Sequence, residues 1–293
     1  MREPEWLAKQ FEENRGHLRG VAYRMLGSSG EADDAVQEAW LRLSRSDADE
    51  IENLGGWLTT VVARVCLDML RSRKARHEEA LSSEVSKPAV AQATLDPEEE
   101  AVLADSVGLA LLVVLDRLNP AERLAFVLHD LFAVSFEEIG SIVGRSTAAA
   151  RQLASRARRR VQGAEGAAHA DLARQRKVVD AFLSAMRAGD FDGLLAVLDP
   201  NVLVRIDEAA GRPGAPREIR GARAWAQGAL TFAHAISATE PALVDGAVGL
   251  VWAPAGHLFR ALRLTITGDK ITQVDIIADP KKLRELDLAV LSD

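Results

Sequence analysis

Two helix starts separated by one glycine-containing turn restrict the fold of residues 135–160 more than any other feature of the sequence. Ser135 precedes Phe136-Glu137-Glu138, the order of a capping box, and the apolar residues that follow keep helical spacing as far as Gly144. Ser146 then begins a second helical run. Two capped helices joined by so short a turn predict a helix-turn-helix.

The second helix of this pair has one apolar face and one polar face. The apolar residues keep helical spacing, and we expect them to pack against the first helix: Ala150, Leu153, Ala154 and Ala157. Arginine and glutamine make bidentate contacts with guanine and adenine edges, and short side chains let a helix approach the major groove. The outward face therefore predicts base contacts from Thr147, Ala148, Arg151, Gln152 and Ser155.

The charge of this segment favours the same function. Residues 145–160 hold six arginines and no acid, although the chain of 293 residues has a formal net charge of −7. Complementarity to the helix dipole would explain arginines at the helix end, but not the capped turn before them. Both features together predict nucleic-acid binding, with Ser146 at the helix start and phosphate contacts from Arg145, Arg156, Arg158, Arg159 and Arg160.

A chain of this length exceeds the usual size of one hydrophobic core, so several domains are expected. Residues 78–105 form an acidic stretch that contains two prolines and predicts a linker. A break rich in glycine and alanine between residues 162 and 175 marks a second boundary. The predicted modules are residues 1–77, 106–164 and 174–293.

Composition excludes several classes of protein. Apolar and charged residues occur in the proportions of a soluble globular chain, and no apolar run is long enough to cross a bilayer. The acidic, polar N-terminus is unlike a secretion signal, so we expect a cytoplasmic protein. The single cysteine, Cys66, lies among apolar residues at helical spacing and is interpreted as a buried core thiol; no metal site and no cofactor are predicted.

The first two modules show helical periodicity, whereas the third module changes period. Apolar positions at 178–186 and 191–198 predict two helices, and residues 221–233 predict another. Alternating segments predict strands joined by hairpins at Asp245-Gly246 and Gly268-Asp269. The predicted fold is multidomain: two all-α domains, the second with the helix-turn-helix, followed by an α+β domain with a curved antiparallel sheet.

Acid–base chemistry in the third module would need a carboxylate or imidazole in an apolar pocket with a partner group. Five residues carry suitable groups: Asp207, His234, Asp245, His257 and Asp275. No pair among them has a diagnostic spacing, and we interpret them as turn or surface groups. No catalytic residue and no enzyme activity are therefore predicted.

Two sequence blocks resemble a known family. EADDAVQEAWLRL and GGWLTTVVARVCLDMLRSRKAR resemble region two of the extracytoplasmic-function (ECF) sigma factors of bacterial RNA polymerase. LNPAERLAFVLHDLFAVSFEEIGSIVGRSTAAARQLASRARRR resembles region four of the same family. The resemblance implies a promoter-specificity subunit that binds core RNA polymerase and promoter DNA, with the helix-turn-helix on the minus-thirty-five element.

The resemblance also implies two surfaces in the first module. An acidic helix face with a tryptophan is typical of a protein interface and would dock on the polymerase clamp helices: Asp33, Asp34, Gln37, Glu38 and Trp40. The next helix and the loop at 49–56 would hold the unpaired minus-ten strand: Asn53, Trp57, Thr60, Arg64, Asp68, Arg71, Arg73 and Lys74. Whether Trp57 stacks on a base or belongs to the core stays open, as does a core role for Trp40.

The third module resembles the SnoaL-like cone that some ECF sigma factors carry as a C-terminal extension, which implies regulation in cis. Asp279-Pro280-Lys281-Lys282-Leu283 is close to an Asn-Pro-Asp-Lys-Leu motif of those extensions, so a regulatory contact is predicted at Asp279, Pro280, Lys281 and Leu283. A plain helix start at Pro280 is the alternative. Residues 207–212 match an Asp-Gly-Gly-Gly-Arg motif only loosely, and the linker lacks a Trp-Leu-Pro-Glu-Pro motif.

Two other functions fit parts of the sequence. A stand-alone helix-turn-helix regulator with a ligand-binding C-terminal domain would leave the first module unexplained. An enzyme with an accessory DNA-binding domain would require turnover by residues 174–293. Each of these functions is compatible with a small-molecule ligand of the third module.

Overall fold

The computed structural model describes residues 4–46, 51–82, 108–163, 169–211, 217–230 and 238–291. The chain divides into two compact units: Met1–Leu103 with Leu115–Arg158, and Ala104–Val114 with Arg159–Asp293. The divisions after Val114 and after Arg158 fall inside helices, and the two units are described separately. The greater part of the predicted linker, from residue 83 onwards, lies outside the described residues.

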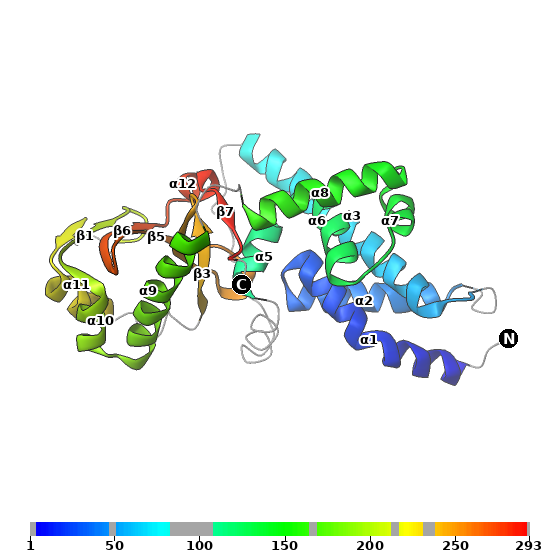
Figure 1. The fold of residues 1–293 in the computed structure, drawn as a ribbon. Helices are drawn as coiled ribbons and strands as arrows, with labels where there is room; N and C mark the ends of the chain where they lie inside the picture. The colour runs from blue at the N-terminus through cyan, green and yellow to red at the C-terminus, as the bar shows by residue number, and fades with distance from the viewer. Residues whose placement is uncertain are drawn as a thin grey trace. The chain divides into compact units, whose positions relative to one another are not determined.

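Unit 1 begins with three helices, α1 (Pro4–Leu26), α2 (Ser29–Leu43) and α3 (Leu54–Ser82), drawn in blue to cyan in Figure 1. Gly27, at φ 74°, turns the chain between α1 and α2, and the side chain of Ser28 caps α2. Two expectations need correction. Leu54 to Gly56 are helical rather than loop, because the Asn53 side chain accepts a hydrogen bond from the Gly56 N–H; and α3 continues to Ser82, beyond the predicted end of the module.

The predicted helix-turn-helix is confirmed, and the helices around it lie in unit 1 except for Leu109–Val114 and Arg159–Gln162, which belong to unit 2. The elements are α5 (Leu109–Asp116), α6 (Pro120–Phe126), the π-helix η2 (Val127–Leu131), α7 (Phe136–Val143) and α8 (Thr147–Gln162). Ser135 and Glu138 form the capping box of α7, and Gly144 ends that helix at φ 70°. Asn119 occupies the N-cap position of α6, but its side chain makes no capping hydrogen bond and instead contacts Glu122.

Unit 2 has a seven-stranded sheet with three helices, α9, α10 and α11, against one face (Figure 1). The helices span His169–Ala188, Phe191–Val197 and Ala222–Ala229, and α12 spans Pro280–Glu285. The strands are β1 (Leu198–Ile206), β2 (Glu218–Arg220), β3 (Thr239–Val244), β4 (Ala247–Trp252), β5 (Arg260–Thr267), β6 (Lys270–Ile277) and β7 (Leu288–Ala289), in the order β2-β1-β6-β5-β4-β3-β7.

The α+β architecture and both hairpins are confirmed, with three corrections. The sheet is mixed rather than antiparallel, because β1 and β6 pair in parallel. The short strands β2 and β7 were not predicted, because each is too brief to show a period. Helix α9 begins at His169, inside the segment interpreted as a break between modules.

Side chains are buried on both faces of this sheet. On the face of the helices the core includes Phe182 and Trp225, whose rings stack with centroids 5.7 Å apart. On the opposite face the side chains of β3, β4 and β5 are also buried: Ala242, Val244, Val251 and Ala261. Glu240 lies on this second face and accepts a hydrogen bond from the Ala110 N–H, which ties the first turn of α5 to unit 2.

The turn of the helix-turn-helix packs on a glycine, which predicts the effect of adding a methyl group there. A Cβ atom on Gly140 would lie 2.8 Å from the carbonyl oxygen of Arg145. Gly140→Ala should therefore lower the free energy of unfolding by about 1–3 kcal/mol, since the turn backbone would have to move. Chemical denaturation measures this change.

Gly16→Ala is the matched control, because Gly16 also lies inside a helix but a Cβ atom there meets nothing within 4 Å. It should raise the free energy of unfolding by about 0.5–1 kcal/mol through helix propensity. Stabilisation by both substitutions would contradict the close approach at Gly140.

Candidate nucleic-acid interface

Helix α8 presents the two faces that its sequence predicts. Its apolar side is fully packed, with Ala150, Leu153, Ala154 and Ala157 at most 3% exposed. On the other side Arg145, Ser146, Ala148, Arg151, Gln152, Ser155 and Arg156 are exposed, and Thr147 and Arg158 are partly exposed. The exposed face is an unobstructed polar surface within unit 1, of the kind a major-groove reader needs.

Arg151 is held by an aromatic stack. Its guanidinium carbon lies 5.7 Å from the centre of the Phe136 ring, and the other aromatic contact of Phe136 is with His129, at 3.8 Å between centroids. His129 belongs to the π-helix η2, where its Nδ1 contacts the Val134 carbonyl oxygen. The contact with the ring favours this position of the Arg151 side chain.

Two of the predicted phosphate-binding arginines have acidic partners. Arg158 donates from Nε to both carboxylate oxygens of Asp130, at 2.8 and 3.0 Å. Arg156 forms an ion pair with Glu122 at 3.2 Å. A phosphate group that binds these arginines must compete with the carboxylates. Neither acid was recognised in the sequence, because each lies on a different helical segment from its arginine.

The residues predicted to hold the minus-ten strand share α3 but not one environment. Arg64, Asp68, Arg71 and Lys74 are exposed, whereas Trp57 and Thr60 are partly buried. Asn53 caps the start of α3 with its side chain. Arg73 pairs with Glu31 of α2 and donates a long hydrogen bond to the Leu26 carbonyl.

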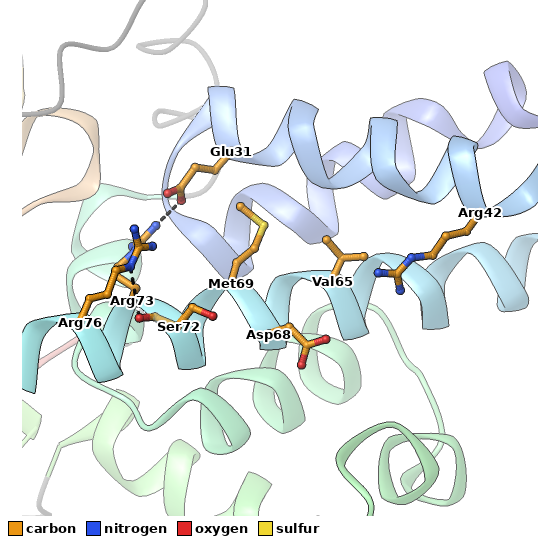
Figure 2. A pocket seen from close by; sticks show the side chains of 8 residues that line it. All are labelled: Glu31, Arg42, Val65, Asp68, Met69, Ser72, Arg73 and Arg76. Carbon is orange, nitrogen blue, oxygen red and sulfur yellow. Dashed lines mark hydrogen bonds and ion pairs between the residues drawn. The ribbon is translucent and has the colours of Figure 1, made fainter.

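A cavity of about 320 Å³ between α2 and α3 brings two of these residues together with Arg76 and with Arg42, which the sequence did not indicate (Figure 2). Asp68 and Arg73 line it, with Arg42 from α2 and Arg76 one turn further along α3. Met69 and Val65 supply its apolar surface. Arg42 lies beside these residues because α2 packs against α3. A local sequence pattern does not reveal that packing.

The predicted polymerase surface lies along α2. Asp34 and Gln37 are exposed, Asp33 pairs with Arg19 at 2.9 Å, and Glu38 pairs with Arg42 at 2.8 Å. Trp40 packs partly on Phe11, with ring centroids 5.0 Å apart. Leu41, on the same helix, is 39% exposed beside these residues.

Within unit 1, α6 and η2 pack on α1 and α3 around a buried cation. Arg123 is 2% exposed; its Nε donates to the carbonyl oxygen of Arg24 at 3.2 Å, and it pairs with Asp116 at 3.4 Å. Burial lowers the pKa of Arg123 to about 10, against the opposing effect of Asp116. Phe132 contacts His17 edge-on at 5.2 Å and the Arg24 guanidinium at 5.3 Å.

This packing leaves a second cavity of about 410 Å³ beside the predicted minus-ten surface. Gly55, Gly56 and Thr60 line one side, and the segment Phe132–Val134 lines the other. Residues that follow η2 therefore lie next to the start of α3 in this arrangement of unit 1.

The segment predicted as a regulatory contact forms the start of α12. Asp279 is its N-cap, accepting hydrogen bonds from the N–H groups of Lys281 and Lys282, and Pro280 is the first helical residue. Leu283 is buried. Asp207, from the loosely matched motif, accepts hydrogen bonds from the Asp279 N–H at 2.8 Å and from Lys282 Nζ at 3.0 Å. Burial raises the pKa of Asp207, but these hydrogen bonds outweigh burial, so its pKa is below the ordinary value.

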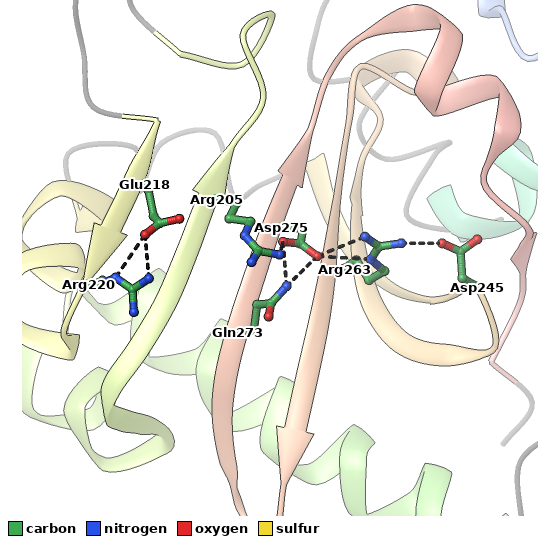
Figure 3. A network of polar contacts seen from close by, with 7 residues as sticks. All are labelled: Arg205, Glu218, Arg220, Asp245, Arg263, Gln273 and Asp275. Carbon is green, nitrogen blue, oxygen red and sulfur yellow. Dashed lines mark hydrogen bonds and ion pairs between the residues drawn. The ribbon is translucent and has the colours of Figure 1, made fainter.

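The other acid–base candidates of unit 2 differ in their surroundings. Asp275 accepts hydrogen bonds from Arg263 at 3.1 and 3.3 Å, and Arg263 also donates to Asp245 at 3.2 Å (Figure 3). His257 is exposed, and His234 lies outside the described residues. In the part of the chain that the structure describes, no group of three or more His, Cys, Asp or Glu residues could hold a metal ion.

Cys66 is fully buried, and burial raises its pKa to about 12, which confirms the core thiol. No helix among the described residues is long and apolar enough to cross a membrane.

Comparison with known proteins places the chain in the sigma class of promoter-binding proteins. Residues 10–76 match Sigma-70 region 2, and residues 108–161 match Sigma-70, region 4. The chain is 36% identical over 277 residues to the probable ECF RNA polymerase sigma factor SigI of Mycobacterium tuberculosis, covering 93% of each chain. It is 38% identical over 288 residues to the ECF RNA polymerase sigma factor SigJ of the same organism, covering 93% of this chain and 92% of SigJ.

Among solved structures, the crystal structure of Mycobacterium tuberculosis SigJ covers 94% of this chain and 98% of its own, at 33% identity and a TM-score of 0.46. An NTF2-like protein from Burkholderia xenovorans LB400 covers 40% of this chain and 97% of its own, at 20% identity and a TM-score of 0.26. The chain belongs to the ECF RNA polymerase sigma factors. It binds core RNA polymerase and promoter DNA and directs transcription initiation.

The pair between Arg158 and Asp130 predicts how an acid limits DNA affinity. Asp130→Asn should strengthen binding to any duplex several-fold and steepen its salt dependence by up to about one unit, because one more arginine is free to neutralise a phosphate. Fluorescence anisotropy with scrambled DNA across a salt series measures both effects.

Asp171→Asn is the control, because Asp171 pairs with Arg174 in α9 and its loss changes net charge by the same amount. It should leave DNA binding unchanged. Equal strengthening by both substitutions would mean that net charge, rather than release of Arg158, governs affinity.

Proposed function

We propose that α8 reads the minus-thirty-five element and that α3 holds the minus-ten strand. Arg151 and Gln152 make the base contacts, and Arg145, Arg156 and Arg158 bind phosphates. The observation that carries this proposal is the position of Arg151, exposed on the polar face of α8 and supported by the ring of Phe136. On α3, the exposed side chains of Arg64, Asp68, Arg71 and Lys74 provide a strand-binding face, with Trp57 and Thr60 at its start.

The polymerase-binding surface of this proposal is α2. Asp33, Asp34, Gln37, Glu38 and Trp40 lie along it, and the exposed side chain of Leu41 adds an apolar contact at the edge. An aromatic and apolar centre with a charged rim is the usual composition of a specific protein interface. Reversal of Asp34 and Glu38 to lysine should abolish pull-down of core polymerase, and retained binding would mean that another surface docks on the polymerase.

A regulatory role for the C-terminal domain is supported by contacts at both ends of the region-four helices. Glu240 of β3 binds the Ala110 N–H in the first turn of α5 at 3.1 Å. At the end of α8, the Val161 carbonyl accepts a hydrogen bond from the Val290 N–H at 2.7 Å. Gly163, at φ 78°, follows α8 and packs closely on Ala289. We propose that the domain acts in cis by fixing these two ends.

The segment Asp279, Pro280, Lys281 and Leu283 remains our candidate for a second regulatory contact. Lys281 is exposed at the start of α12, and within the described residues its ammonium group forms no hydrogen bond or ion pair. We further propose that the domain binds a molecule rather than transforming one, since the carboxylates of Asp207, Asp245 and Asp275 each have a cationic partner. An assay for turnover by the full chain is the corresponding test.

The two kinds of contact proposed for α8 predict different losses. Arg151→Ala should cost about 1–3 kcal/mol at the cognate minus-thirty-five element and relax preference at one base position. Arg158→Ala should weaken binding to all sequences alike and reduce the salt slope. Anisotropy with cognate and scrambled duplexes distinguishes them; identical profiles for the two variants would refute the assignment.

The contact at Glu240 predicts that a substitution in the C-terminal domain alters promoter use. Glu240→Ala removes an acceptor and a negative charge at the N-terminus of α5, so the amides of its first turn should exchange hydrogen faster. Run-off transcription with core polymerase should then show changed activity or promoter preference. Hydrogen exchange and run-off assays of the same protein preparation test both statements.

Glu218→Ala serves as the control, because Glu218 lies in β2 and pairs with Arg220 on the strand surface. It removes the same charge from the same domain without touching α5. If both variants transcribe as the unsubstituted chain does while the α5 amides of Glu240→Ala exchange faster, regulation through this contact is wrong.

A further inference from the structure

Arg260 of the C-terminal unit is partly buried without an acidic partner among the described residues. Arg260, the first residue of β5, is partly buried, and its Nε is closed off from solvent without a hydrogen-bond acceptor. Its single hydrogen bond within the described ranges runs from NH2 to the Ala210 carbonyl oxygen, at the 3.5 Å limit. Burial lowers the pKa of this guanidinium, and no carboxylate offsets that effect.

The side of the sheet that carries Arg260 is the side that faces the helices. Arg260 pairs in register with Trp252 at the end of β4, and Leu250 and Leu262 follow two residues along the same face. Leu250 belongs to the core under the helices. Arg260 and Trp252 therefore stand at one end of the apolar core, where β4 ends and β5 begins.

Two aromatic rings accompany the guanidinium. Its carbon lies 5.6 Å from the centre of the Trp252 ring. Phe259 lies 5.7 Å from Trp252 between ring centroids, tilted by 51°, and is 42% exposed. A large exposed aromatic side chain beside a cation that lacks a counter-charge offers both an apolar surface and a strong donor.

Arg263, three residues further along β5, lies on the other face of the strand and differs from Arg260 in its partners. It is exposed and donates to Asp275 and Asp245, as Figure 3 shows. Buried donors in native proteins nearly always have an acceptor, so the unpaired Nε of Arg260 departs from the usual pattern. The two arginines of β5 are therefore chemically different, although they are neighbours.

We propose that Arg260, Trp252 and Phe259 form a binding site for a planar aromatic carboxylate. The carboxylate accepts hydrogen bonds from terminal N–H groups of the Arg260 guanidinium, and the ring packs on Phe259. This site rests on the binding role proposed above for the C-terminal domain and names the class of ligand; it does not depend on the roles of α8 or α3.

The test uses the full chain and 2-naphthoate as the probe, with 2-naphthamide as its neutral analogue and acetate as the carboxylate without a ring. Isothermal titration should give one saturable site for 2-naphthoate, with binding of the other two compounds at least about tenfold weaker. In nuclear magnetic resonance spectra the indole N–H signal that disappears in Trp252→Phe should be the one most shifted by 2-naphthoate. Absence of saturable binding overturns the proposal, and so does equal binding of the amide.

Arg260→Gln should abolish 2-naphthoate binding, whereas Arg263→Gln should leave it unchanged. Phe259→Ala, at an exposed position, should weaken binding without affecting the fold, so the proposal stays testable if Arg260→Gln unfolds. Binding that survives both Arg260→Gln and Phe259→Ala overturns the site. If 2-naphthoate does not bind while promoter and polymerase binding are intact, only the ligand site is refuted. Promoter binding and polymerase binding do not depend on this site.

Discussion

The buried charge of Arg123 is the interaction on which the arrangement of unit 1 depends. A guanidinium that is 2% exposed loses its hydration, and two acceptors replace it: the Arg24 carbonyl near the end of α1 and the carboxylate of Asp116. Carbonyl groups at a helix C-terminus carry partial negative charge, so this end of α1 suits a cation. The contact joins α6, which leads into the helix-turn-helix, to the helix that leads into α2.

The buried Arg123 contact affects how easily α6 can separate from α1. Separation of α6 from α1 would return the guanidinium to water, and the regained hydration would offset part of the free energy needed to separate the two helices. Phe132 adds an apolar contribution, lying over Gly20 and against His17. A junction that contains a buried charge is more easily opened than a purely apolar core of the same size. This property suits a subunit whose two DNA-binding elements must contact promoter sites that lie apart.

The parts of this structure that the sequence predicted are those with local causes. Ser135, Glu138 and Gly144 determine the helix-turn-helix within ten residues, and the period of β3 to β6 is visible in each strand alone. Arg123, Asp130 and Glu122 were missed because their partners lie on other helices, and a single sequence without its fold contains no sign of them. The parallel pairing of β1 with β6 escaped for the same reason, since nearly seventy residues separate the two strands.

Acidic partners explain how a strongly basic helix can be part of an acidic protein without binding DNA indiscriminately. Arg156 and Arg158 are paired with Glu122 and Asp130, whereas Arg151 is supported by an uncharged ring. The pairs reduce the sequence-independent attraction to phosphate, which is the main source of non-specific affinity. Arg151 keeps its full donor capacity for a base edge. The discrimination of α8 between sequences therefore depends as much on which arginines have carboxylate partners as on which arginines are present.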